Sequence, residues 1–152
     1  MEYIQKKIPV PCVCKEGARM PYYASRGAAG ADVSAFIDTE IILLPGSRRL
    51  IPTGLFFQIP HGYEIQVRSR SGLALKNGVT VLNAPGTIDS DYRGELMVIL
   101  INRSSEPFTI ENGMRIAQIV VAEVTQGEFK QVEEVSTATE RGEGGFGHTG
   151  LL

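Results

Sequence analysis

Short apolar runs alternate with turn-forming residues along most of the chain. The runs are rich in Val, Ile, Leu, Phe and Tyr, and they cover residues 33–37, 41–44, 54–60, 63–68, 78–82, 95–102, 107–110 and 115–124. Between them stand Pro-Gly, His-Gly and Asn-Gly pairs, which supply the fixed or positive φ of tight turns. Many short strands separated by such turns indicate an all-β sandwich, jelly roll or barrel.

A single segment, residues 71–76 with the sequence SGLALK, has the pattern of a helix. We expect Ser71 to be its N-cap and the pair Asn77-Gly78 to end it. The helix would be short, so strands dominate the predicted fold.

The apolar pattern stops near Val135, and the rest of the chain has the composition of a flexible tail. Residues 136–152 read STATERGEGGFGHTGLL and hold five glycines between Gly142 and Gly150. One interpretation is a frayed end without contacts. The other is an arm whose Arg141 and Phe146 fold over a ligand, at a cost in ordering entropy. We therefore divide the chain into a β-barrel at 1–135 and an arm at 136–152.

Composition and charge restrict the possible partners. A chain of 152 residues with 43% hydrophobic and 21% charged residues corresponds to one globular domain. Fifteen Lys and Arg against seventeen Asp and Glu give a net charge of -2, which argues against a broad nucleic-acid surface. The longest apolar stretch, residues 96–101, is far shorter than the ~20 residues of a membrane-spanning helix. We expect a cytoplasmic protein that binds neither nucleic acid nor membrane, with any anion site confined to a local cluster.

Several short patterns carry no chemistry. Cys12 and Cys14, one residue apart, form neither a disulfide framework nor a metal site, and we expect two thiols on one face of an extended segment. Residues 142–147 fit GxGxxG, but no helix can follow them in the remaining five residues. Residues 89–100 lack the ligands of a calcium loop, and His61 is far from His148 in the sequence.

Two polar segments at predicted strand ends have the residue types of a nucleotide site. Arg70, Ser71 and Gly72 place a guanidinium, a hydroxyl and an unshielded backbone N–H together, which favours a phosphate. Residues 83–94 carry an amide, two carboxylates and a phenol, groups that can pair with a base edge, accept a proton from water and stack on a sugar. The alternative for this second segment is a set of turn formers with solvated side chains.

Five segments of the chain resemble the ordered motifs of the homotrimeric dUTP pyrophosphatases (dUTPases). They are AGADVSA (29–35), RSGLA (70–74), NAPGTIDSDYRGE (83–95), RIAQ (115–118) and RGEGGFGHTG (141–150). The order and spacing of the motifs agree as well. The resemblance implies an all-β, distorted jelly-roll β-barrel with one short helix, assembled as a homotrimer with a flexible C-terminal arm.

The resemblance also implies a reaction. A member of this family would hydrolyse dUTP to dUMP and pyrophosphate by attack of water on the α-phosphorus, limiting uracil in DNA and supplying dUMP for thymidylate synthesis. Asp89 would be the general base. The cofactor would be Mg²⁺ held by the substrate phosphates and waters, with Asp32 and Gln118 behind those waters and no direct protein ligand.

Each active site would be shared by three chains. The first chain would supply the nucleoside-binding residues Asn83, Gly86, Thr87, Ile88, Tyr92 and Met97. The second would bind the phosphates through Arg70, Ser71, Gly72 and Gln118. The third would lend the arm, with Arg141 on the terminal phosphate and Phe146 followed by Gly147 over the uracil. Tyr92 against the deoxyribose would leave no room for a 2′-hydroxyl.

One departure from the family pattern limits the resemblance, and two rival functions have to be weighed against the hydrolase. His148-Thr149 stands where many relatives have two small hydroxyl residues, which weakens the expected phosphate contacts at that end. The nearest rival, a dCTP deaminase of the same superfamily, would lack the glycine-rich arm. A non-catalytic protein on the same scaffold would lack Asp89 or the arm. Both are present here, so the sequence favours the hydrolase.

Overall fold

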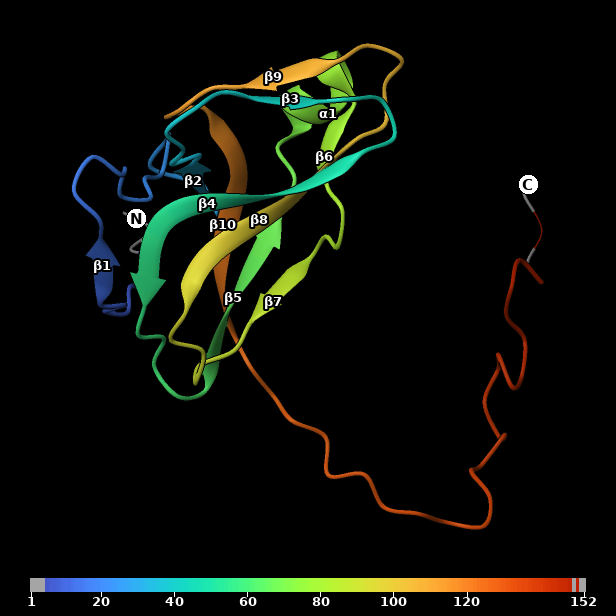
Figure 1. Cartoon of the computed structure of the whole chain (residues 1–152). Helices are drawn as coiled ribbons and strands as arrows, with labels where there is room; N and C mark the ends of the chain where they lie inside the picture. Colours follow the sequence, from blue (N-terminus) through green and yellow to red (C-terminus); the bar gives the residue numbers. More distant parts are fainter. Residues whose placement is uncertain (1–4, 149, 151–152) are drawn as a thin grey trace.

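Two four-stranded antiparallel sheets form the barrel of this computed structural model, which describes residues 5–148 and 150 (Figure 1). One sheet has the order β1 (Cys12–Cys14), β4 (Arg48–Phe57), β8 (Glu95–Asn102) and β6 (Val79–Val81). The other has the order β2 (Ala31–Ser34), β10 (Arg115–Glu123), β5 (Tyr63–Arg68) and β7 (Gly86–Ile88). A two-stranded ribbon of β3 (Ile41–Leu43) and β9 (Phe108–Ile110) lies at one end of the barrel.

A single apolar core joins the two sheets. Along β8 the buried residues Leu96, Val98 and Leu100 alternate with more exposed ones, as expected for a strand with one face inward. The same cluster includes residues of the second sheet, among them Ile65 of β5 and Ile116 of β10. The predicted all-β jelly-roll fold with one short helix is confirmed.

β4 and β7 are among the strands that differ from the sequence prediction. β4 runs from Arg48 to Phe57, whereas the apolar run had placed a strand at residues 54–60. Its first two residues are the exposed Arg48 and Arg49, which carry no apolar signal, yet they pair with β8. Gly54 has φ of 71° and lies where the β4–β8 register shifts, and a β-carbon there would come within 2.6 Å of Ala18. β7 was not predicted because its three residues lie inside a polar segment.

The helix α1 (Ser71–Asn77) follows the prediction except at its first residue. Its N-cap is Arg70, without a side-chain capping bond, so the prediction of Ser71 as the N-cap was wrong and Ser71 is the first helical residue. Gly78, with φ of 64°, ends the helix and donates its N–H to the carbonyl of Ala74, as expected from Asn77-Gly78. Within residues 5–148 and 150, no helix has the length and apolar character needed to cross a bilayer.

Asn102 is a fully buried polar residue at the end of β8. Its amide nitrogen donates to the carbonyls of Leu43 (2.9 Å) and Glu106 (2.7 Å). Its amide oxygen accepts from the backbone N–H and the hydroxyl of Ser104. These bonds fix the ribbon strand β3 and the turn after β8 to the barrel.

After β10 the chain runs away from the barrel as an extended segment without strand or helix in its described residues (Figure 1). In residues 136–148 and 150 the described backbone hydrogen bonds are local, for example from the N–H of Gly144 to the carbonyl of Arg141. The division into 1–135 and 136–152 stays a prediction, and residues 1–4, 149, 151 and 152 lie outside the described residues.

Candidate functional site

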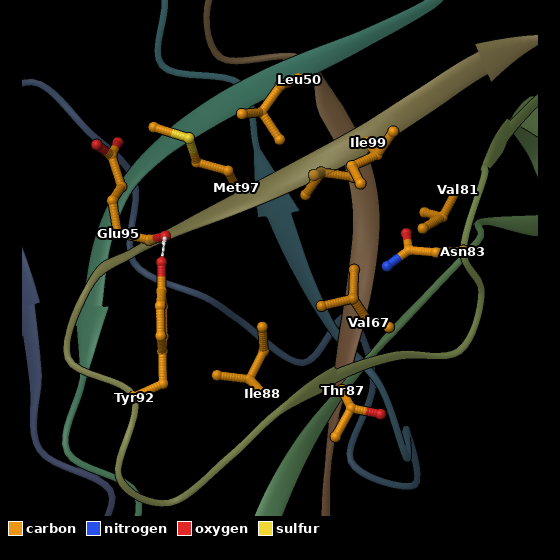
Figure 2. Close-up of a pocket in the computed structure, with 12 residues that line it drawn as sticks. Leu50, Val67, Val81, Asn83, Thr87, Ile88, Tyr92, Glu95, Met97 and Ile99 are labelled. Carbon is orange, nitrogen blue, oxygen red and sulfur yellow. Dashed lines mark hydrogen bonds between the residues drawn. The ribbon is translucent and has the colours of Figure 1, made fainter.

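A hollow of about 240 Å³ opens between the segment 83–92 and the outer face of β8 (Figure 2). Its walls include apolar side chains of β4, β5, β6, β7 and β8, and its polar side chains are those of Asn83, Thr87, Tyr92 and Glu95. The complete lining is Leu50, Val67, Val81, Asn83, Gly86, Thr87, Ile88, Tyr92, Glu95, Met97, Val98 and Ile99. All six residues predicted to bind the nucleoside therefore line one hollow.

β7 reaches this position because its first residue has no side chain. Gly86 pairs with Val67 of β5, and a β-carbon on Gly86 would lie 3.3 Å from both Val67 and the amide nitrogen of Asn83. β7 is the edge strand of its sheet, so its outer backbone groups face away from β5. Such an edge can pair with a planar polar ligand.

The Tyr92 ring forms one side of the hollow (Figure 2). Its hydroxyl donates to the backbone carbonyl of Glu95 at 2.9 Å. The Glu95 carboxylate accepts from the backbone N–H of Gly54 (2.7 Å) and from Nζ of Lys15 (3.3 Å). The ring is thus connected, through Glu95, to the bulge of β4.

Asp89, the predicted general base, lies at the end of β7 and lines a different hollow, of about 670 Å³. Its carboxylate is exposed. The second hollow also includes His61, Tyr63, Glu64, Asp91, Val124 and Gln126. Thr87 lines both hollows, so β7 lies between Asp89 and the first hollow of the same chain.

A charged cluster lies where β2 and β10 meet the segment before α1. Asp32 accepts from Nε of Arg70 (3.2 Å) and from Nη1 of Arg115 (3.0 Å). Arg115 also donates to the Tyr22 hydroxyl at 3.0 Å, and Tyr22 first, then Asp32, raise the pKa of its guanidinium. Two guanidiniums against one carboxylate leave a local positive charge suited to phosphate. The sequence analysis named Asp32 and Arg70 as site residues but missed Arg115, although Arg115 opens the RIAQ segment.

Gln118 contacts the backbone just before the segment that was predicted to bind phosphate. Its amide nitrogen donates to the carbonyl of Ser69 at 2.9 Å. The Ser69 hydroxyl accepts from the N–H of Val81 at 2.9 Å, which holds this segment to β6. Ser71 and Gly72 follow at the start of α1, and both are exposed.

The donor groups of the cluster do not form a protein cage for a metal ion. In the described residues, no three His, Cys, Asp or Glu side chains converge. Both oxygens of Asp32 already accept from guanidiniums. Asp32 and Gln118 therefore suit contacts to the waters of a hydrated cation better than direct ligation.

The predicted arm residues lie away from these groups. Arg141, Phe146 and Gly147 are exposed and line neither hollow, and the Phe146 ring is fully exposed. The residues predicted to bind the nucleoside thus line one hollow of this chain, and the residues predicted to bind the phosphates and the predicted arm residues do not line it.

Comparisons with known proteins agree with the motifs. The dUTPase family model matches residues 16–150. The deoxyuridine 5′-triphosphate nucleotidohydrolase of Chlamydia muridarum is 60% identical over 91% of this chain and 96% of its own. That of Fusobacterium nucleatum is 56% identical over 95% and 99%, respectively.

Solved structures show the same fold. The dUTPase of Staphylococcus bacteriophage 80alpha with dUpNHpp matches with a TM-score of 0.82 and 28% identity, over 95% of this chain and 100% of that chain. A variant dUTPase from phage phi11 of S. aureus, described for its coordination of a structural Mg(II) ion, matches with a TM-score of 0.74 and 26% identity, over 84% and 98%. The match of sequence, fold and ordered motifs leads to one conclusion, that this chain belongs to the dUTPase family.

Proposed function

We propose that this protein hydrolyses dUTP to dUMP and pyrophosphate by Mg²⁺-assisted attack of water on the α-phosphorus. The observation that carries the proposal is the hollow of Figure 2, which gathers all six expected nucleoside residues in a chain of the dUTPase family. By this activity the protein would limit uracil in DNA and supply dUMP in the cytoplasm.

Uracil selection follows from the width of the hollow. The Asn83 amide and the edge backbone of β7 pair with the polar edge of the base, while Val67 and Ile88 contact its face. Because Gly86 brings β7 close to β5, little space remains for the 5-methyl group of thymine or the 4-amino group of cytosine. Tyr92 packs against the deoxyribose and excludes a 2′-hydroxyl.

The phosphate residues bind and orient the triphosphate. Arg70 offers positive charge. Its guanidinium is held by hydrogen bonds to the Asp32 carboxylate and to the backbone carbonyl of Arg115. The Ser71 hydroxyl and the Gly72 N–H donate to phosphate oxygens, and Gln118 holds the backbone just before them. Bound Mg²⁺, carried by the triphosphate and waters, would neutralise part of the phosphate charge.

Asp89 accepts the proton of the attacking water. Its carboxylate is exposed at the end of β7, next to the strand that binds the base. The oxygen of water bonds to the α-phosphorus, the bond from that phosphorus to the bridging oxygen breaks, and pyrophosphate leaves with the electron pair. The product left in the hollow is dUMP.

Each site takes residues from three chains in this proposal. The nucleoside hollow of one chain is lined neither by Arg70, Ser71 and Gly72 nor by the arm. A second chain supplies those phosphate residues, and a third supplies Arg141, Phe146 and Gly147. An arm that leaves the barrel, as in Figure 1, can reach a neighbouring chain.

The test is an incubation of the protein with Mg²⁺ and each common deoxynucleoside triphosphate, with product identification and sedimentation analysis of the active sample. We expect cleavage of dUTP alone, release of pyrophosphate and a trimer mass. Release of inorganic phosphate or equal use of dTTP would refute the proposed reaction, and ammonia release from dCTP would favour the deaminase. A monomer mass in a fully active sample would refute the shared site.

A further inference from the structure

Gly94 has no space for a side chain because the Tyr92 ring fills it. A β-carbon on Gly94 would overlap the Tyr92 hydroxyl oxygen, and it would lie 2.6 Å from Cζ and 3.0 Å from Cε2 of the ring. The backbone itself does not demand glycine here, since Gly94 is not among the residues with positive φ. The constraint at Gly94 is therefore its contact with the ring.

The ring depends on this contact because surrounding packing does not enclose it. Tyr92 is 45% exposed, so a displaced ring can swing into solvent. Its described anchor is the bond from its hydroxyl to the carbonyl of Glu95, in the residue directly after Gly94. The Glu95 carboxylate, with its side chain 13% exposed, is held by the N–H of Gly54 and by Lys15.

The Glu95 carbonyl, which accepts the hydrogen bond from the Tyr92 hydroxyl, therefore has a fixed position. Thr53 strengthens this by donating its hydroxyl to the carbonyl of Leu96, the next residue along β8, at 2.6 Å. When the Tyr92 hydroxyl bonds to this acceptor, the ring lies where a β-carbon on residue 94 would stand. A methyl group there would push the ring away from the carbonyl and change the shape of the hollow.

We infer that Gly94 is a positioning residue that sets sugar selectivity by fixing the Tyr92 ring. The inference rests on the proposed function, in which Tyr92 excludes a 2′-hydroxyl. Gly94 does not line the hollow, so it touches no substrate in this scheme and acts only through the ring.

The test compares kcat/KM for dUTP and UTP in the wild type and in Gly94→Ala. We expect the ratio of kcat/KM for dUTP to kcat/KM for UTP to fall by about 10-fold or more. A displaced ring no longer packs against the sugar, and such a site discriminates weakly against an added hydroxyl. Gly27→Ala is the matched control, since a β-carbon at Gly27 meets nothing within 4 Å, and its ratio should not change. An unchanged ratio in a folded Gly94→Ala protein would overturn the inference.

A double-mutant cycle separates positioning from a general structural effect. Once Tyr92→Ala has removed the ring, adding Gly94→Ala should not lower the ratio further. Equal losses from Gly94→Ala with and without the ring would overturn the inference.

A second variant keeps the test decisive if Gly94→Ala does not fold. Tyr92→Phe keeps the ring but removes the bond to the Glu95 carbonyl, so the ratio should fall in part, and an unchanged ratio would count against the fixed ring. The wild type separates the two proposals. If it does not cleave dUTP, the proposed function fails, whereas strong dUTP preference retained in Gly94→Ala refutes only the role of Gly94.

Discussion

The side-chain amide of Gln118 packs directly against Gly30, in the space that a side chain at residue 30 would need. A β-carbon on Gly30 would overlap the amide oxygen of Gln118 and lie 2.9 Å from its carbonyl carbon. In this position Gln118 donates to the carbonyl of Ser69, just before the proposed phosphate residues. The close approach of β2 and β10 thereby influences the segment at the start of α1.

Gly30→Ala should lower turnover of dUTP. The methyl group forces the Gln118 amide away from Ser69, which loosens the backbone that carries Arg70. Overpacking at such a site costs about 1–3 kcal/mol in free energy of unfolding. Steady-state kinetics and a denaturant melt of the same sample measure both effects. Gly27→Ala, in open space nearby in the sequence, is the control. Full activity with unchanged stability would show that Gln118 needs no fixed position.

Asp89→Asn should lower turnover by about 10²–10⁴-fold, the range for loss of a general base. The amide keeps the size of the carboxylate but cannot accept the proton of the attacking water. The variant should still bind a non-hydrolysable dUTP analogue, and calorimetry measures this binding. Loss of binding with normal turnover at saturation would make Asp89 a recognition residue instead.

Deletion of residues 141–152 should leave the fold intact and reduce turnover strongly. The described arm residues contribute no buried apolar side chain, so the melting temperature and the trimer mass should stay unchanged. Turnover should fall because Phe146 and Arg141 no longer close over the substrate. Wild-type turnover in a folded, truncated trimer would return the tail to the interpretation of a frayed end. Loss of the trimer would make the tail a structural strap.

Alkylation of Cys12 by iodoacetamide should be slower than that of an exposed thiol, and its rate should rise only at a higher pH. Burial, with a smaller contribution from Cys14, raises the pKa of the Cys12 thiol. A raised pKa means less reactive thiolate at a given pH, so the rate is suppressed below that pKa and recovers as pH rises through it. Mass spectrometry of timed samples across the pH range measures this rate. An alkylation profile equal to that of a free cysteine would contradict it.

Local sequence determined the strands with one buried face. In β8 and β10, apolar residues had to be buried, and glycine or proline pairs supplied the turns between such strands. The end of α1 followed in the same way from Asn77-Gly78, since glycine adopts the left-handed conformation there without strain. The six motif residues predicted to bind the nucleoside also line one hollow of the folded chain.

Tertiary structure decided what no local pattern encodes. The start of β4 and the whole of β7 carry little apolar signal, and they become strands because β8 and β5 offer them unpaired backbone groups. The pairing of Asp32 with both Arg70 and Arg115 joins residues far apart in the sequence. The contacts of Gly30 with Gln118 and of Gly94 with Tyr92 form only when the backbone brings each pair together. The sequence does not predict them, because a glycine has no side chain from which a contact partner could be inferred.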